Sequence, residues 1–182
     1  MSPVSRPVFL PHPLLPDADW ADRFTLRLPA GGLTARHAAR LTLERPPLRI
    51  RAFLVSRNRL VAPFGWKKTP AEDGATIGGI PVISAGDDRV VLGADGRHLD
   101  FRIVIDVRQD RPRGQTLSFM TLLRRRSLPA RLYLAAVLPF HKYVLRGLLA
   151  GIDRPWSRER KRKGEAYGDG DAALTLTRRG KG

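Results

Sequence analysis

The chain has 182 residues, the usual size of a single domain, and its hydrophobic content of 42% is enough for one ordinary core. It contains no cysteine, which excludes disulfides, thiolate nucleophiles and cysteine-ligated metal sites and fits a cytoplasmic location. The formal net charge is +16, and a surface this basic attracts nucleic acid or acidic lipid.

The first 19 residues are predicted to form an extended lead-in, because five prolines fix φ there and disfavour helix. The same prolines interrupt the apolar run that a signal peptide needs. No membrane-spanning helix is predicted either. The most apolar stretch, residues 128–152, contains Arg131, Lys142 and Arg146, and its longest run without a polar residue is far shorter than a span.

A first strand is predicted at residues 23–28, where apolar and polar residues alternate. Two short helices are predicted after it. Thr34 is a suitable N-cap for a helix that runs to about Arg45, where two consecutive prolines must end it. The second helix is predicted at residues 48–61, from apolar residues that face away from four arginines.

From residue 76 onward the pattern changes to a period of two, which predicts an antiparallel meander. Asp95-Gly96 is the strongest hairpin signal within it. Along residues 98–108 the apolar side chains share one face and the polar side chains share the other, apart from Val104. The meander is therefore predicted to bury one side only. Its strands are expected at residues 80–85, 89–94, 98–108 and 115–126.

A long final helix is predicted to start near Pro129, to continue through Pro139 with a kink, and to end near Gly151. Residues 153–182 combine a basic cluster at 158–163 with little apolar periodicity, so we expect a flexible basic tail. The buried face of the helix is expected to carry five large residues, Tyr133, Val137, Phe140, Val144 and Leu148.

The predicted fold class is α+β, a curved antiparallel sheet wrapped on a long C-terminal helix, with two short helices after the first strand. One domain is expected over residues 20–152, between the lead-in (residues 1–19) and the tail (residues 153–182). The apolar face of the sheet is expected to pack against the final helix.

Four segments of the chain resemble a known family in residue type and in order. They are Ala18-Asp-Trp-Ala-Asp22, Val61-Ala-Pro-Phe-Gly65, Arg97-His-Leu-Asp-Phe-Arg102 and Arg131-Leu-Tyr-Leu-Ala-Ala-Val-Leu-Pro-Phe-His141. In these segments the chain is similar to the bacterial family named domain of unknown function 2867. Its order of elements resembles the helix-grip fold of the START-like (SRPBCC) superfamily. The resemblance implies a cavity between sheet and helix that holds an apolar or amphipathic metabolite, and it names no substrate.

The first functional hypothesis is a small-molecule binding module, with its cavity between the meander and the C-terminal helix. A histidine at the edge of a helix's apolar face is either a hydrogen-bond partner for a ligand or a satisfied structural residue. No cofactor is predicted. The expected ligand-binding residues come from the facing sides of strand and helix: Phe101, Ile103, Phe119, Tyr133, Val137 and His141.

A second hypothesis is an anion-surface binder that takes nucleic acid or acidic lipid through the helix at residues 48–61 and the cluster at 158–163. The basic charge has another interpretation, since a GC-rich genome favours arginine whatever the function.

A third hypothesis is a cyclase-like or hydrolase-like enzyme that uses His141, or His98 with Asp100 and Arg102 on one strand face. A solvated, charge-paired sheet surface explains the latter group better.

No recognisable catalytic constellation is present, which favours a protein without enzyme activity. The four histidines, His12, His37, His98 and His141, are far apart, and no metal-binding pair occurs among them. Neither a phosphate-binding loop nor a nucleophile motif occurs. No metal site is expected.

Overall fold

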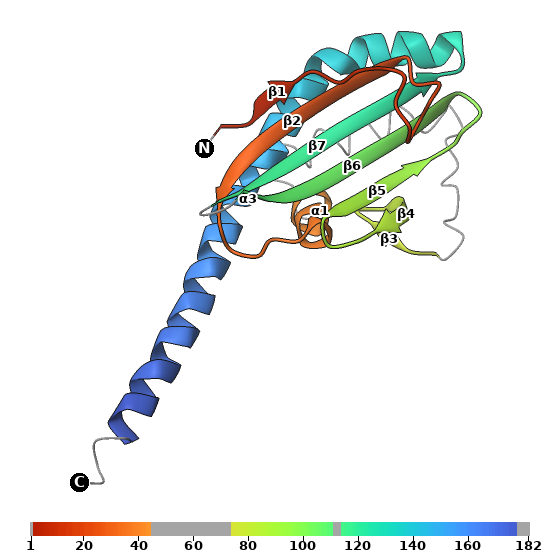
Figure 1. Ribbon diagram of the computed structural model, residues 1–182. Coiled ribbons are helices and arrows are strands. Elements are labelled where there is room, and N and C mark those ends of the chain that lie inside the picture. The colour runs from red at the N-terminus through yellow and green to blue at the C-terminus, as the bar shows by residue number, and fades with distance from the viewer. Residues whose placement is uncertain (1, 45–73, 111–113, 178–182) are drawn as a thin grey trace.

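The computed structural model describes residues 2–44, 74–110 and 114–177, with side chains up to residue 152. The fold is α+β, with a seven-stranded antiparallel sheet and a long C-terminal helix (Figure 1). The strands lie in the order β1-β2-β7-β6-β5-β4-β3. The predicted helix at residues 48–61 lies outside the described residues. The elements are β1 (Val4–Arg6), β2 (Trp20–Pro29), α1 (Ala35–Leu43), β3 (Thr76–Ile77), β4 (Ile80–Ala85), β5 (Arg89–Ala94), β6 (Leu99–Asp110), β7 (Gly114–Arg125) and α3 (Leu128–Thr177).

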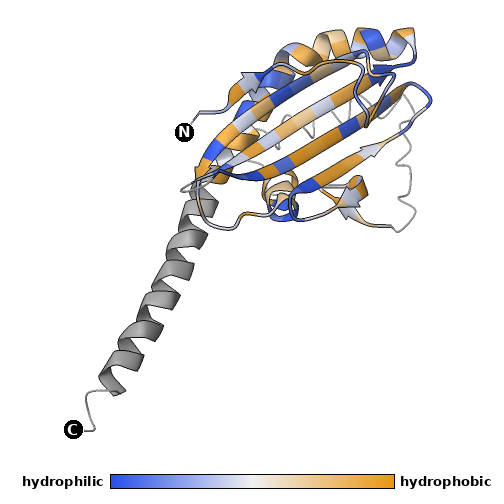
Figure 2. Cartoon of the chain, in the orientation of Figure 1, coloured by the Kyte–Doolittle hydropathy of each residue, from blue (hydrophilic) through white to orange (hydrophobic). Residues whose placement is uncertain are grey.

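The predicted meander is confirmed, since β4 pairs with β5, β5 with β6 and β6 with β7, all antiparallel. β7 then pairs with β2, which brings the first long strand beside the last one. Gly93 allows β5 and β6 to lie close together, because a Cβ atom there would sit 2.2 Å from the carbonyl oxygen of Phe101. Apolar and polar segments alternate along the strands, as the period of two predicts (Figure 2).

The capping prediction for α1 is confirmed, because the Thr34 hydroxyl accepts a hydrogen bond from the backbone N–H of His37 at 3.2 Å. The helix ends at Leu43, close to the predicted end. Its buried side is made of small residues, which bring the helix backbone close to the sheet. They are Ala35, Ala38, Ala39 and Thr42.

The start of α3 also follows the prediction. The Ser127 hydroxyl accepts a hydrogen bond from the backbone N–H of Ala130 at 3.4 Å, as an N-cap does. Pro129 occupies the first turn, where a missing N–H costs no hydrogen bond. The helix then continues through Pro139.

The end of α3 differs from the prediction, because the helical backbone runs to Thr177 instead of ending near Gly151 (Figure 1). Loss of apolar periodicity does not end a helix when the residues that follow, such as the Arg, Glu and Lys at 158–163, are good helix formers. The flexibility expected of the tail stays a prediction. Among the described residues, no helix is both long and apolar enough to cross a bilayer.

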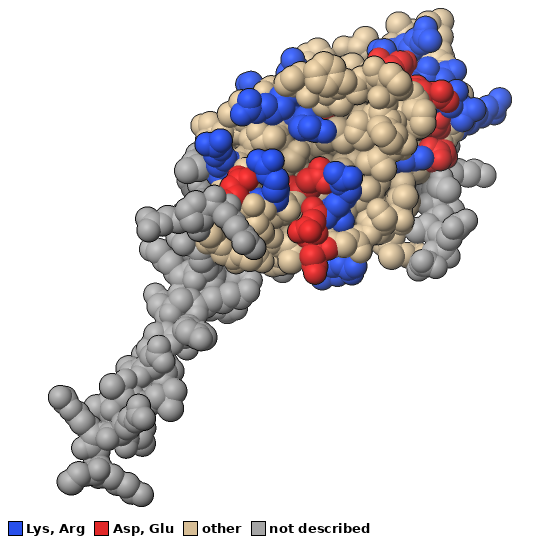
Figure 3. Space-filling view, viewed as in Figure 1, with Lys and Arg blue, Asp and Glu red and all other residues tan. Residues whose placement is uncertain are grey.

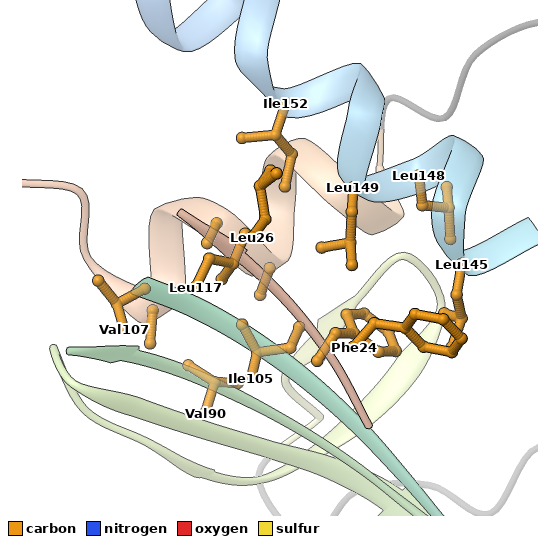
Figure 4. Packing of buried hydrophobic residues seen from close by; sticks show 14 of the residues in the cluster. Phe24, Leu26, Val90, Ile105, Val107, Leu117, Leu145, Leu148, Leu149 and Ile152 are labelled. Atoms are coloured by element: carbon orange, nitrogen blue, oxygen red, sulfur yellow. The ribbon is translucent and has the colours of Figure 1, made fainter. Parts of the chain in front are cut away.

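The main core lies between one face of the sheet and two helices, α1 and α3. α3 packs on β2 and β7 and against α1, whereas α1 packs on β5 and β6. The labelled side chains of α3 point toward the sheet (Figure 4). The prediction was right for Val144 and Leu148 but wrong for Phe140, which is 55% exposed. Leu145 and Leu149 take the central positions instead, which turns Phe140 away from the sheet. The labelled core residues are Phe24, Leu26, Val90, Ile105, Val107, Leu117, Leu145, Leu148, Leu149 and Ile152.

The opposite face of the sheet is partly covered as well, which corrects the prediction of a single buried side. The N-terminal lead-in supplies β1 at the sheet edge, and its Leu15 packs against Val104 and Met120. Val104, the apolar exception in the polar pattern of β6, is 0% exposed for this reason. The lead-in is therefore part of the packed fold.

Truncation of a central helix residue should test the packing of α3. We expect Leu149→Ala, at a fully buried position, to lower the free energy of unfolding by about 2–5 kcal/mol. The matched control is Leu132→Ala, on the same helix at a position that is 66% exposed, which should change it by less than about 0.5 kcal/mol. Urea unfolding followed by circular dichroism measures both, and equal losses would show that α3 does not pack as described.

Candidate ligand-binding site

A polar row interrupts the apolar face of the sheet that α3 covers. On β2 the buried positions alternate as Asp22, Phe24 and Leu26, so a carboxylate stands where an apolar residue is expected. Asp22 is only 9% exposed. Across the sheet it pairs with Thr121 of β7, which pairs with Ile103 of β6. Strand register thus places Asp22, Thr121 and Ile103 side by side on one face.

His141 reaches this row from α3. Its Nε2 lies 3.4 Å from Oδ2 of Asp22 and 3.3 Å from Oγ1 of Thr121. The edge of its ring meets Trp20, with ring centroids 5.4 Å apart and planes at 76°. The His141 side chain is 23% exposed, so the group lies at the margin of the core and not at its centre. We call Asp22, Thr121 and His141 the polar centre.

The Asp22 carboxylate has unused hydrogen-bonding capacity. Both of its oxygens are buried, and neither accepts a hydrogen bond from any residue that the structure describes. Burial of a carboxylate costs on the order of several kcal/mol unless a charge and hydrogen bonds compensate it. His141 supplies one polar neighbour for Oδ2, and Oδ1 has no hydrogen-bond partner in the described chain. The polar centre can therefore still accept a donor.

Apolar clusters lie on both sides of the polar centre. On one side, the next cross-strand pair on this face after Asp22 and Thr121 is Phe24 and Phe119, and both belong to the main core. On the other side a smaller cluster joins the sheet to the first turns of α3. It consists of Leu99, Leu123 and Leu134, with Trp20, Phe101, Tyr133 and Leu138 packed against them. The polar centre thus separates two apolar clusters on one face.

The six predicted ligand-binding residues lie on facing sides of the sheet and α3. Phe101 and Tyr133 belong to the small cluster, Ile103 lies beside Thr121, and His141 belongs to the polar centre. Phe119 is almost fully buried in the main core. The sixth residue, Val137, is half-buried on α3.

Sequence reasoning missed Asp22 and Thr121. One signal was available: Asp22 is in phase with Phe24 and Leu26, so the alternation itself places a charged residue on the buried face. The contact with His141 also joins two of the segments that carry the family resemblance, those ending at Asp22 and at His141.

The second predicted group, His98, Asp100 and Arg102, does not form a catalytic arrangement. Nδ1 of His98 lies 3.1 Å from the Ser127 hydroxyl, and Arg102 makes a forked ion pair with Asp95 at 2.7 and 3.0 Å. Asp100 is 3% exposed and accepts a hydrogen bond from a backbone N–H at 3.0 Å. Charge pairing was predicted correctly, whereas the solvated position predicted for Asp100 was wrong.

Arginines on the sheet and at its ends are largely matched by acidic residues. Basic and acidic side chains lie next to one another over part of the face turned away from the helix, and another part of it carries basic side chains alone (Figure 3). Arg6, Arg23 and Arg27 of β1 and β2 form no ion pair with a described residue, so free positive charge stays on this face. Ion pairs join Arg89 to Asp106, Arg102 to Asp95, Arg108 to Asp110, Arg124 to Asp17 and Arg125 to Asp19.

The residues proposed for an anion surface stay untested. The helix at 48–61 lies outside the described residues, and the cluster at 158–163 lies on helical backbone without described side chains. In the ranges with described side chains, no group of three or more potential metal ligands occurs.

The chain matches a known protein family. The model of a family described as protein of unknown function, DUF2867, matches residues 14–148. This range contains β2 to β7 and the first part of α3, including the whole polar centre. No curated protein and no solved structure matches the chain.

A double-mutant cycle should show that Asp22 and His141 interact. We expect Asp22→Asn and His141→Gln to be non-additive in unfolding free energy by about 0.5–3 kcal/mol, because the two groups are in contact. Urea unfolding of the two single variants and the double variant measures the coupling.

The control cycle combines Asp22→Asn with Arg108→Gln. Arg108 lies five residues along β6 from Ile103, roughly 17 Å at about 3.3 Å per residue. These two substitutions should add to within about 0.5 kcal/mol. Additive behaviour of the Asp22 and His141 pair as well would contradict the polar centre.

Proposed function

Since the chain belongs to the DUF2867 family, which is described only as proteins of unknown function, we propose a function from its geometry. The protein is a small-molecule binding module of the helix-grip class. Its ligand is amphipathic, with an apolar body between the sheet and α3 and a polar end at the polar centre. The ligand's polar end carries a hydrogen-bond donor, as a protonated amine or a hydroxyl group does.

The observation that carries this proposal is the unsatisfied carboxylate of Asp22. A chain gains nothing in stability from a buried carboxylate that accepts no hydrogen bond. A ligand that supplies the missing hydrogen-bond donor explains such a group. Burial makes the unpaired carboxylate unfavourable, and the same burial makes the site select ligands that carry a donor. Thr121 and His141 then fix the direction in which the polar end points.

The apolar body of the ligand has a natural position beside the small cluster. There Phe101 of β6 and Tyr133 of α3 are only partly buried, although they lie at the junction of sheet and helix. Aromatic and aliphatic side chains around a few placed polar groups are the usual composition of a small-molecule site. Val137 and His141 follow on the same helix at spacings of four residues, so they continue this wall toward Asp22.

Three probes with one chain length and different head groups should test the proposal. By isothermal titration calorimetry we expect decylamine to bind best, decanol more weakly and decanoate weakest. The dissociation constants of decylamine and decanoate should differ by about tenfold or more, because the decanoate head group would face a like charge. The overall charge of +16 attracts decanoate, so a preference for the amine reports on the site and not on the whole surface.

Asp22→Asn should reduce that preference to within about threefold, since it keeps the shape and removes the charge. The control is Asp95→Asn, a carboxylate paired with Arg102 on the opposite face, which should leave the preference unchanged. Equal binding of amine and carboxylate by the native protein would place the polar end elsewhere. Failure of all three probes to bind would reject the binding function.

A second candidate function is acid–base catalysis by His141 on a bound ligand. Asp22 and Thr121 both approach Nε2 of the ring, which leaves Nδ1 to accept or donate a proton. Hydrolysis of p-nitrophenyl decanoate tests this candidate. His141→Gln should lower the rate by about 100-fold, whereas His98→Gln, at a histidine bound to Ser127, should not change it. Hydrolysis no faster than in buffer, or equal in both variants, would leave binding as the function.

A further inference from the structure

The outer side of α3 carries an apolar stripe that no part of the described chain buries. Leu128 is 68% exposed, Leu132 is 66% exposed and Tyr143 is 62% exposed. At about 100° per residue these three side chains fall within a sector of roughly 60°. Large hydrophobic side chains scattered singly are normal on a surface, whereas an aligned set indicates a binding surface. We call these three residues the outer stripe.

Basic residues border the outer stripe, and acidic residues are absent from this part of the helix. Residues 128–152 contain Arg131, Lys142 and Arg146 and no Asp or Glu. The Arg146 guanidinium lies 5.9 Å from the centre of the Phe24 ring, which holds it against the sheet. Arg131 and Lys142 are exposed, and neither forms an ion pair within the described part of the chain. On the helical wheel both fall within about 60° of Leu128 on one side.

We propose that the outer stripe docks the protein on the surface of an anionic lipid bilayer. An apolar stripe with basic residues along its edge is the pattern of a helix that lies in the plane of a membrane interface. The leucines and the tyrosine ring would enter the head-group region, while the long side chains of Arg131 and Lys142 reach lipid phosphates. Figure 2 shows apolar and polar segments side by side along this first half of α3.

Charge favours a bilayer over a second copy of the chain. In a symmetric dimer through the outer stripe, Arg131 and Lys142 of both copies would meet across the interface, and like charges oppose such a contact. An anionic surface removes this repulsion and gains from each cation. The outer stripe shares no residue with the polar centre, so this docking does not depend on the proposed binding function.

Co-sedimentation of the full chain with vesicles tests the proposal. We expect binding to vesicles of 30% phosphatidylglycerol in phosphatidylcholine, and binding at least tenfold weaker to vesicles of phosphatidylcholine alone. Leu128→Gln with Leu132→Gln should weaken partitioning to the anionic vesicles by about tenfold or more, because each leucine contributes buried apolar area. Arg131→Gln with Lys142→Gln should weaken it too, and should flatten its dependence on salt.

The matched control replaces two other exposed apolar residues, Val4→Gln with Ile83→Gln, each 51% exposed and located on strands. It should leave partitioning unchanged. All variants keep the basic cluster at 158–163. If the tail alone attached the protein to vesicles, the leucine variant would bind as tightly as the native chain. That result would overturn the proposal. Absence of binding to anionic vesicles would overturn it as well. Light scattering that shows a native dimer and a monomeric leucine variant would assign the outer stripe to a second copy instead.

Discussion

The packing of α3 on β2 and β7, beside α1, is the interaction on which the rest of the structure depends. Leu145 and Leu149 meet Phe24 and Leu26 of β2, and this contact buries the face of the sheet that would otherwise expose its apolar residues to water (Figure 4). It also fixes the rotation of the helix. Once Leu145 and Leu149 face the sheet, the half-buried His141 is brought to the row of Asp22, and Leu132 and Tyr143 turn outward. The two proposed functional surfaces are consequences of that single rotation.

Within this packing, the polar centre has an unfavourable energy balance that a ligand would correct. Asp22 and Thr121 occupy positions where apolar residues would extend the core without interruption between Phe24 and Trp20. An apolar pair there would be neutral or stabilising for the fold. The reason is that the free-energy cost of removing two charges from water can exceed the attraction between them. The chain instead keeps a carboxylate with free acceptors beside an imidazole. This loss of stability is understandable when recognition of a ligand compensates it.

Most of the fold follows from periodicity in the sequence, because patterns of two and of 3.6 residues report local structure directly. The alternation in β6, the Thr34 cap and the Ser127-Leu-Pro129 start of α3 are local signals of this kind. The rotation of α3 is not local. Leu145 and Phe140 are equally apolar in sequence, and only their fit against β2 decides which of them is buried.

The candidate site was predictable in part for the same reason. The five apolar ligand-binding residues and His141 lie on apolar faces that periodicity reveals, whereas Asp22, the carboxylate that His141 contacts, lies on β2, far from α3 in the sequence. Strand register and helix position together create that contact, and neither is contained in a single segment. The sequence did not predict that Leu15 covers Val104. A proline-rich segment without periodicity does not indicate which surface it packs on.

A crystal structure of the full chain with decylamine would show directly whether Asp22 receives the polar end of a ligand. We expect the amine nitrogen within hydrogen-bond distance of Oδ1 of Asp22, with the alkyl chain against Phe101 and Tyr133. Side chains that fill this space completely, with decylamine bound elsewhere or not at all, would contradict this expectation.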